Sequence, residues 1–186
     1  MGDGLNGEAK VRTALLAADR RVDMLRVVAD LGLPDAWIAA GAIRNAVWDA
    51  MHCHPVSTPL ADVDVIWFDP TRATSDLDRT LESRLSEWMP GVIWSVKNQA
   101  RMHQRHGNEP YNDCLDAMRS WPETATAVGA RLTSVGTIEF QTAFGFSDLL
   151  GLILRPTRPG DPKSPFWDRI AAKGWLRTWP KLRVVP

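Results

Sequence analysis

The chain of 186 residues carries 22 basic and 22 acidic side chains, and this balance gives it no overall attraction to nucleic acid or membranes. Its composition, 45% apolar and 24% charged, excludes a disordered chain and is typical of a globular protein with a real core. Cys53 and Cys114 form no spaced set, no apolar run could span a bilayer, and the polar N-terminus lacks a signal-peptide pattern. We therefore expect one cytoplasmic domain over residues 1–186, with no disulfide and no membrane partner.

Apolar spacing predicts helices and strands that are interleaved along the chain. Helical spacing from Val11 to Val28 predicts one N-terminal helix over about residues 8–31, ended by Gly32. An apolar run at 37–40 predicts a buried strand. The patterns further along predict a helix at 43–51, a strand at 63–68, a helix at 77–88, a strand at 92–96, a short helix near residue 116, a strand pair at 126–132 and 137–142, and a helix that starts at Ser164-Pro165.

The charge balance changes near the C-terminus. From Arg155 to Pro186 there are eight basic and two acidic residues, which leaves 14 basic and 20 acidic residues in the rest of the chain. We therefore separate a core of about residues 35–155 from a basic, Trp-rich C-terminal segment at 155–186. Basic residues interleaved with aromatic ones suit single-stranded nucleic acid, so RNA is a candidate partner. The alternative, which we favour, is that the segment docks on the acidic body of the protein.

A predicted helix start has the features of a phosphate-binding site. Gly41 and Ala42 open the helix, and glycine lets a phosphate approach the backbone closely. The helix N-terminus offers free N–H donors and a partial positive charge. Arg44, just inside the helix, adds a planar guanidinium that fits phosphate oxygens.

Asp62 and Asp64 interrupt the strongest apolar strand pattern in the chain. Because they are two residues apart in a strand, both face the same side, with Cα atoms about 6.6 Å apart. Two carboxylates about 4 Å apart near a surface repel by about 4 kcal/mol, and a bound Mg²⁺ or Mn²⁺ removes this repulsion. Most Asp-x-Asp pairs are solvated strand ends, but charges within so apolar a strand favour a metal site.

These motifs resemble the signature of the polymerase-β-like nucleotidyltransferase superfamily. The sequence Gly41-Ala42-Ile43-Arg44-Asn45, followed by Asp62-Val63-Asp64-Val65, is especially similar to the Gly-Gly-x-Val-Arg-Asp head motif of CCA-adding enzymes. Stretches at 37–45, 96–103 and 121–129 resemble a bacterial family of small stand-alone nucleotidyltransferase-like proteins, and the likeness covers most of residues 35–180.

The resemblance implies an α+β fold, in which helices pack against a mixed β-sheet. It implies metal-dependent transfer of a nucleotidyl group from a nucleoside triphosphate to a small molecule, an RNA or a protein. Asp62 and Asp64 would be the catalytic residues and the ligands of Mg²⁺ or Mn²⁺. The residues that we predict to bind the nucleotide are Gly41, Ala42, Arg44, Asn45, Lys97 and Asn98.

Three departures from the signature keep an alternative open, a catalytically degenerate module that binds a nucleotide without transferring it. Ala42 stands where Gly or Ser is usual, the gap from Gly41 to Asp62 is long, and the next predicted strand has no third carboxylate. Asp116 or Glu139 could replace that acid. We favour instead Lys97 as a fixed positive charge in the same cleft.

Two further motifs have a plain structural interpretation beside a functional one. His52-Cys53-His54 resembles part of a zinc site, but zinc needs more ligands, and a polar loop is the better interpretation. Trp121 to Thr124 is a turn with an aromatic anchor, or else a segment in which Glu123 or Thr124 contacts the acceptor.

Overall fold

A computed structural model describes residues 2–161 and 164–186. Its helices are α1 (Gly2–Leu16), α2 (Asp19–Ala29), α3 (Gly41–Met51), α4 (Ser75–Trp88), α5 (Met102–His106), α6 (Cys114–Met118), α7 (Ser147–Leu150), α8 (Phe166–Lys173) and α9 (Trp175–Thr178). Its strands are β1 (Trp37–Ala39), β2 (Val63–Trp67), β3 (Trp94–Asn98), β4 (Val128–Leu132), β5 (Ile138–Thr142), β6 (Ile153–Leu154) and β7 (Arg183–Val184).

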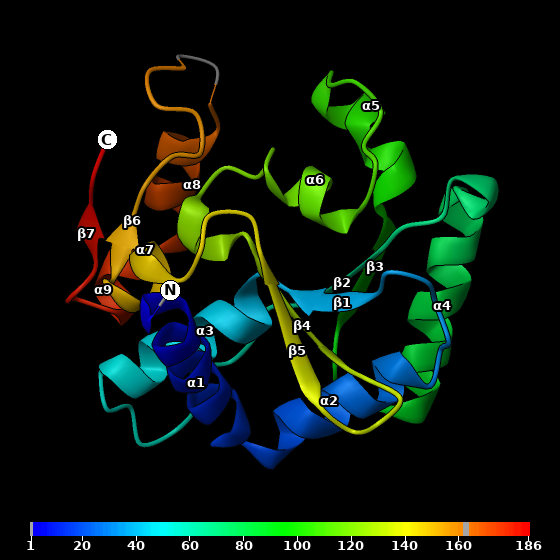
Figure 1. Ribbon diagram of the computed structural model, residues 1–186, viewed down its shortest axis with the longest axis horizontal. Coiled ribbons are helices and arrows are strands. Elements are labelled where there is room, and N and C mark those ends of the chain that lie inside the picture. The colour runs from blue at the N-terminus through cyan, green and yellow to red at the C-terminus, as the bar shows by residue number, and fades with distance from the viewer. Residues whose placement is uncertain (1, 162–163) are drawn as a thin grey trace.

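The central element is a mixed five-stranded sheet, with strand order β3-β2-β1-β4-β5 (Figure 1). β2 and β3 run parallel, whereas β1 is antiparallel to both β2 and β4, and β4 is antiparallel to β5. β6 and β7 form a separate parallel pair. The α+β class with a mixed sheet, expected from the sequence, is confirmed.

Alternation along β2 assigns its residues to the two faces of the sheet. Val63, Val65 and Trp67 are almost completely buried in the main core, together with residues of α1–α4. Asp64 and Ile66 face the other side, where Ile66 joins a smaller apolar cluster that includes Met118 of α6. A strand that is apolar on one face and interrupted by a carboxylate on the other therefore supports a core and a polar site at once.

The helices cover the two faces unequally. In Figure 1, α2 and α4 lie on one side of the sheet, and α5 and α6 on the other.

The predicted helix over 8–31 is in fact two helices, because Ala18 has an extended backbone (φ −135°, ψ 108°) and separates α1 from α2. The change of direction lets both Leu15 and Val28 enter the main core. None of the described helices is both long and apolar enough to cross a bilayer.

The C-terminal elements lie beside α3 at one end of the sheet (Figure 1). Phe166, Trp175, Trp179 and Leu182 are buried in the main core. The rings of Trp175 and Trp179 pack edge-on against Trp48 of α3, at centroid distances of 5.9 and 5.1 Å. The aromatic residues of the basic segment therefore serve mainly to pack it onto the body, although Trp167 remains 55% exposed.

Candidate functional site

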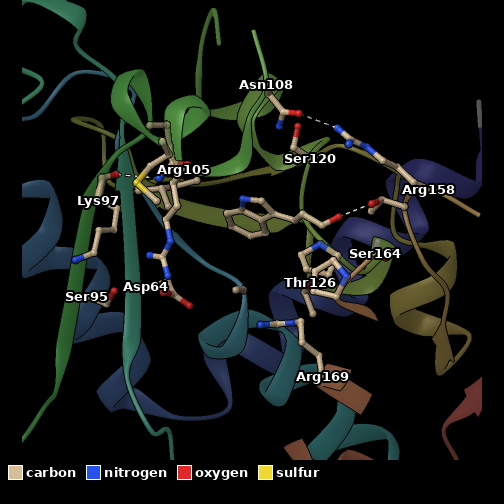
Figure 2. A pocket seen from close by; sticks show the side chains of 18 of the residues that line it. Asp64, Ser95, Lys97, Arg105, Asn108, Ser120, Thr126, Arg158, Ser164 and Arg169 are labelled. Carbon is tan, nitrogen blue, oxygen red and sulfur yellow. Dashed lines mark hydrogen bonds between the residues drawn. The ribbon is translucent and has the colours of Figure 1, made fainter. Parts of the chain in front are cut away.

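A cavity of about 650 Å³ opens on the sheet face opposite the main core (Figure 2). β2 and β3 supply Asp64, Ser95 and Lys97 to one wall. The rest of the lining comes from Ala40 before α3 and from segments around 99–108, 120–126 and 157–169. The cavity therefore joins the predicted carboxylate to parts of the chain that lie more than 90 residues away in the sequence.

Asp62 and Asp64 have different surroundings. Asp64 is half-buried within β2 and lines the cavity, whereas Asp62 immediately precedes β2, is exposed, and borders a neighbouring hollow beside Arg21 and Thr58. The two carboxylates still act on one another. Burial first, and repulsion from Asp62 second, raise the pKa of Asp64 to about 6, although the charge of Arg44 opposes this. The cavity wall thus holds a carboxylate whose ionised form is destabilised.

The start of α3 carries backbone strain at the edge of the cavity. Ala40, the N-cap residue, has φ +49° and ψ −114°, a conformation that suits glycine and costs other residues about 1–3 kcal/mol. Counting back from Arg44, the glycine pair of the Gly-Gly-x-Val-Arg-Asp motif aligns with Ala40 and Gly41. The position at which this chain lacks a glycine of the motif, and at which its backbone is strained, is therefore Ala40. Ala42, which we had identified as the departure, lies buried inside the helix.

Arg44 is buried and lies outside the described lining of the cavity, but its positive charge acts on Asp64 in the cavity wall. Its Nε and Nη2 donate to Oδ1 of Asn45 (3.2 and 2.9 Å), and its guanidinium lies over the rings of Trp48 and Trp175 (5.1 and 4.5 Å to the centroids). Burial lowers the pKa of Arg44 to about 10, so the group stays charged at neutral pH. Neither Arg44 nor Asn45 is among the described residues that line the cavity.

Lys97 and Asn98 lie on opposite faces of the sheet, because they are adjacent in β3. Asn98 is completely buried, and its amide donates to the carbonyl of Asp69 and accepts from the Asp69 N–H. We therefore no longer expect Asn98 to contact a nucleotide. Lys97 lines the cavity, but its Nζ donates to Glu82 at 2.7 Å, and Figure 2 shows its amino group turned away from Asp64.

The position next to Asp64 on β3 is occupied by Ser95. The two residues are paired in register, and both line the cavity. Glu139 lies exposed on β5, the edge strand farthest from β3, in an ion pair with Arg131 (2.7 Å). Asp116, on α6, accepts hydrogen bonds from Asn112, so neither candidate acid contributes to the described lining.

Three arginines of the cavity were not predicted from the sequence. Arg105, Arg158 and Arg169 bring guanidinium groups to the lining, and Trp121, which we expected to anchor a turn, adds an aromatic wall. Arg158 donates to Oδ1 of Asn108 at 3.3 Å. The basic excess of residues 155–186 hinted at two of these arginines, but no spacing rule connects them to Asp64.

Glu123 is fully buried and cannot contact an acceptor. Its Oε1 accepts from Nε of Arg169 at 2.6 Å, and its Oε2 accepts from Oγ1 of Thr126 at 2.9 Å. Of the two interpretations of this segment, the structural one is therefore correct for Glu123.

The histidines of His52-Cys53-His54 have structural partners. His52 donates from Nδ1 to the carbonyl of Trp48 (2.8 Å) and accepts at Nε2 from the N–H of Lys181 (3.0 Å). Nδ1 of His54 lies 3.1 Å from Asp49. Within residues 2–161 and 164–186, no group of three or more His, Cys, Asp or Glu side chains is arranged to hold a metal ion. The loop thus fastens the end of α3 to the C-terminal segment.

Comparisons with known proteins show which family and which solved structures this chain resembles. A family model described as nucleotidyltransferase matches residues 26–184. An NMR structure described as a CCA-adding enzyme head domain is 32% identical, with a TM-score of 0.80 over 94% of this chain and 95% of that one.

Two structures of a tRNA-processing enzyme, apo form I and apo form 2, show a similar fold. They are 14% and 16% identical to this chain, both with a TM-score of 0.51. The matches cover 88% and 87% of this chain but only 42% and 44% of those chains. A comparison with curated proteins gives no significant match. Since the family model covers most of the sequence, the chain belongs to the nucleotidyltransferase family.

Proposed function

We propose that the protein transfers a nucleotidyl group from a nucleoside triphosphate to an acceptor, and that Asp62 and Asp64 hold Mg²⁺ or Mn²⁺ for this reaction. The observation that carries the proposal is the position of Asp64 in a member of the nucleotidyltransferase family. Asp64 is a half-buried carboxylate on a cavity wall, repelled by Asp62 and approached by several cations. A divalent cation together with an anionic substrate would balance these charges.

The side chains at this position fit a magnesium-type ion. Mg²⁺ in phosphate-transferring sites is held by one or two carboxylates, and water and substrate phosphates complete its octahedral shell. Asp64 and Asp62 offer such carboxylates, and Ser95 adds a hydroxyl beside Asp64. When bound, the ion would neutralise negative charge on the reacting phosphate and help to orient the attacking oxygen.

The N-terminus of α3 is the element that we expect to approach the triphosphate. The first N–H groups of a helix have no partner within the helix and can donate to phosphate oxygens. Gly41 begins α3, and a Cβ placed on it would meet only Nη2 of Arg44, at 3.5 Å. Gly41 therefore leaves the backbone open on this side without being required for packing.

The acceptor would be activated weakly. A serine hydroxyl can hydrogen-bond an acceptor hydroxyl but is a poor base at neutral pH, and β3 places Ser95, with no carboxylate, beside Asp64. We therefore expect slow transfer, unless the acceptor supplies its own base.

RNA is the acceptor that we would test first. The 32%-identical relative is described as the head domain of a CCA-adding enzyme, and the fold is shared with a tRNA-processing enzyme. Arg105, Arg158 and Trp121 at the cavity offer the combination of cations and an aromatic ring that single-stranded nucleic acid uses. A nucleotide-binding module without transfer remains the second candidate, because β3, the strand beside Asp64, carries no third carboxylate.

The two candidates differ in pyrophosphate release. The protein is incubated with each α-labelled nucleoside triphosphate, Mg²⁺ or Mn²⁺, and total RNA, and both pyrophosphate and labelled RNA are measured. We expect wild type to release pyrophosphate, Asp64→Asn to be inactive, and Glu139→Gln, a carboxylate outside the cavity, to behave as wild type. Triphosphate binding without any pyrophosphate release would support the binding module instead.

A further inference from the structure

Arg169 connects a fully buried carboxylate with the cavity. It projects from α8 and is 36% exposed at its side chain, and it lines the cavity. Its Nε donates to Oε1 of Glu123 at 2.6 Å, and its Nη2 lies 3.5 Å from Oε2. Figure 2 shows the nitrogen-bearing end of Arg169 directed into the cavity, toward the side where Asp64 lies.

The pairing with Glu123 holds the guanidinium without using all of its donors. A guanidinium has five N–H groups, and those on Nη1 of Arg169 find no acceptor among the residues that the structure describes. Glu123 itself is fixed by Thr126. Arg169 therefore presents free donors to the cavity from a side chain whose rotamer is already restricted, which lowers the entropy lost when it binds an anion.

The local charge also favours an anion. Arg44 and Arg169 are close enough to repel one another electrostatically, and Glu123 is the one carboxylate that contacts Arg169 in the described part of the chain. Arg44, Arg169 and Glu123 together carry a net charge of +1, which offsets the negative charge of Asp64 on the cavity wall, so a divalent cation at Asp64 would leave positive charge for an anion.

We propose that Arg169 binds the triphosphate of the substrate, and that Glu123 is the positioning residue that holds it there. This inference rests on the proposed function and makes it more specific. The phosphate-binding guanidinium then comes from the C-terminal segment, whereas Arg44, which the sequence motif favoured, is buried and lies outside the described lining of the cavity.

Other cations at the cavity are less suited to this role. Lys97 is neutralised by Glu82, and Arg44 is only 8% exposed between two Trp rings. Arg105 is exposed on a short helix, and Arg158 donates to Asn108, a partly exposed residue, rather than to a buried carboxylate among the described residues. Of these groups, Arg169 alone combines access to the cavity with a buried carboxylate that fixes it.

The test uses inorganic tripolyphosphate with Mg²⁺, because it carries the phosphate chain without a base. Arg169→Lys keeps the charge but loses the planar fork, and we expect it to bind about tenfold more weakly than wild type. Arg169→Ala alone would leave Glu123 buried without a partner and could unfold the protein. We therefore use the double variant Glu123→Gln with Arg169→Gln, which removes both charges, and expect a loss of about 100-fold.

Arg177→Gln is the matched control, since Arg177 is exposed on α9 and lies outside the described lining of the cavity. It should bind tripolyphosphate within twofold of wild type. Glu123→Asp, which keeps the charge but shortens the side chain, should raise KM for the nucleoside triphosphate more than it lowers kcat. A purely structural role would instead lower the melting temperature and the amount of active protein, with KM unchanged.

Two failures are distinguishable. If wild type and both Arg169 variants bind tripolyphosphate equally, Arg169 is not the anchor, and the proposed function is untouched. If wild type binds neither tripolyphosphate nor any nucleoside triphosphate, the proposed function fails, and this inference fails with it.

Discussion

Asp64→Asn should stabilise the metal-free protein, and the gain should depend on pH. Burial and Asp62 raise the pKa of Asp64 to about 6, whereas the carboxyl of an unfolded chain has its ordinary value of 3.8. Because the folded state prefers the protonated acid, ionisation of Asp64 destabilises the fold. This cost is absent below about pH 4, develops between pH 4 and 6, and is complete above pH 6.

The size of the effect follows from the two pKa values. At 1.36 kcal/mol for each pKa unit, the gap between 3.8 and about 6 corresponds to about 3 kcal/mol. Solvent reaches part of this side chain, so we expect Asp64→Asn to gain about 1–3 kcal/mol at pH 8 and close to nothing at pH 4.

Urea unfolding from pH 4 to 8 in the presence of EDTA would measure this difference. Glu139→Gln is the matched control, because it removes a strand carboxylate whose exposed ion pair with Arg131 stabilises by less than about 1 kcal/mol. A destabilised Asp64→Asn at pH 8, or a difference that does not vary with pH, would refute the reasoning. With Mg²⁺ in place of EDTA, the melting temperature of wild type should rise and that of Asp64→Asn should not.

Three other changes test separate features of the structure. Ala40→Gly should raise the free energy of unfolding by about 1 kcal/mol, because relief of the strain at φ +49° outweighs the extra backbone entropy of glycine; a lower urea midpoint would contradict this. Deletion from Pro165 onward should cause aggregation by light scattering, since it removes Phe166 and Trp175 from the core, and a soluble, cooperatively folding truncation would show that the segment is dispensable. Glu139→Gln should leave pyrophosphate release unchanged, and a loss of activity would identify Glu139 as the missing acid.

The sequence predicted local features better than it predicted which faces of the elements meet. The apolar pattern at 63–68 correctly indicated a strand, and the period of two put Asp64 on the face opposite Val63 and Val65. The same rule applied to β3 would have separated Lys97 from Asn98, which we had placed together. The N-terminal helix was predicted as one because the apolar spacing continues through Ala18, where the backbone turns for reasons of packing.

The rest of the site depends on contacts between distant segments. Arg169 and Glu123 are 46 residues apart, and no periodicity relates a helix of the C-terminal segment to a buried turn. Arg44 matched a phosphate-binding motif, but its burial results from Trp175, which a motif cannot reveal. The strand pattern could therefore place Asp64 on the face that forms the cavity wall, whereas the cations of the cavity could be found only in the folded structure.

The alternation of inward and outward side chains along β2 also disfavours pairing of the strand in the wrong register. Ala39 pairs with Asp64 across β1 and β2, so a slip of one residue would turn Asp64 into the main core and expose Val63, Val65 and Trp67. An ionised carboxylate buried among apolar side chains is severely destabilising, so the mispaired sheet is strongly disfavoured. An apolar residue in place of Asp64 would remove this penalty and make β2 apolar on both faces. Such a variant should misfold more often during refolding, even where its native state is the more stable one.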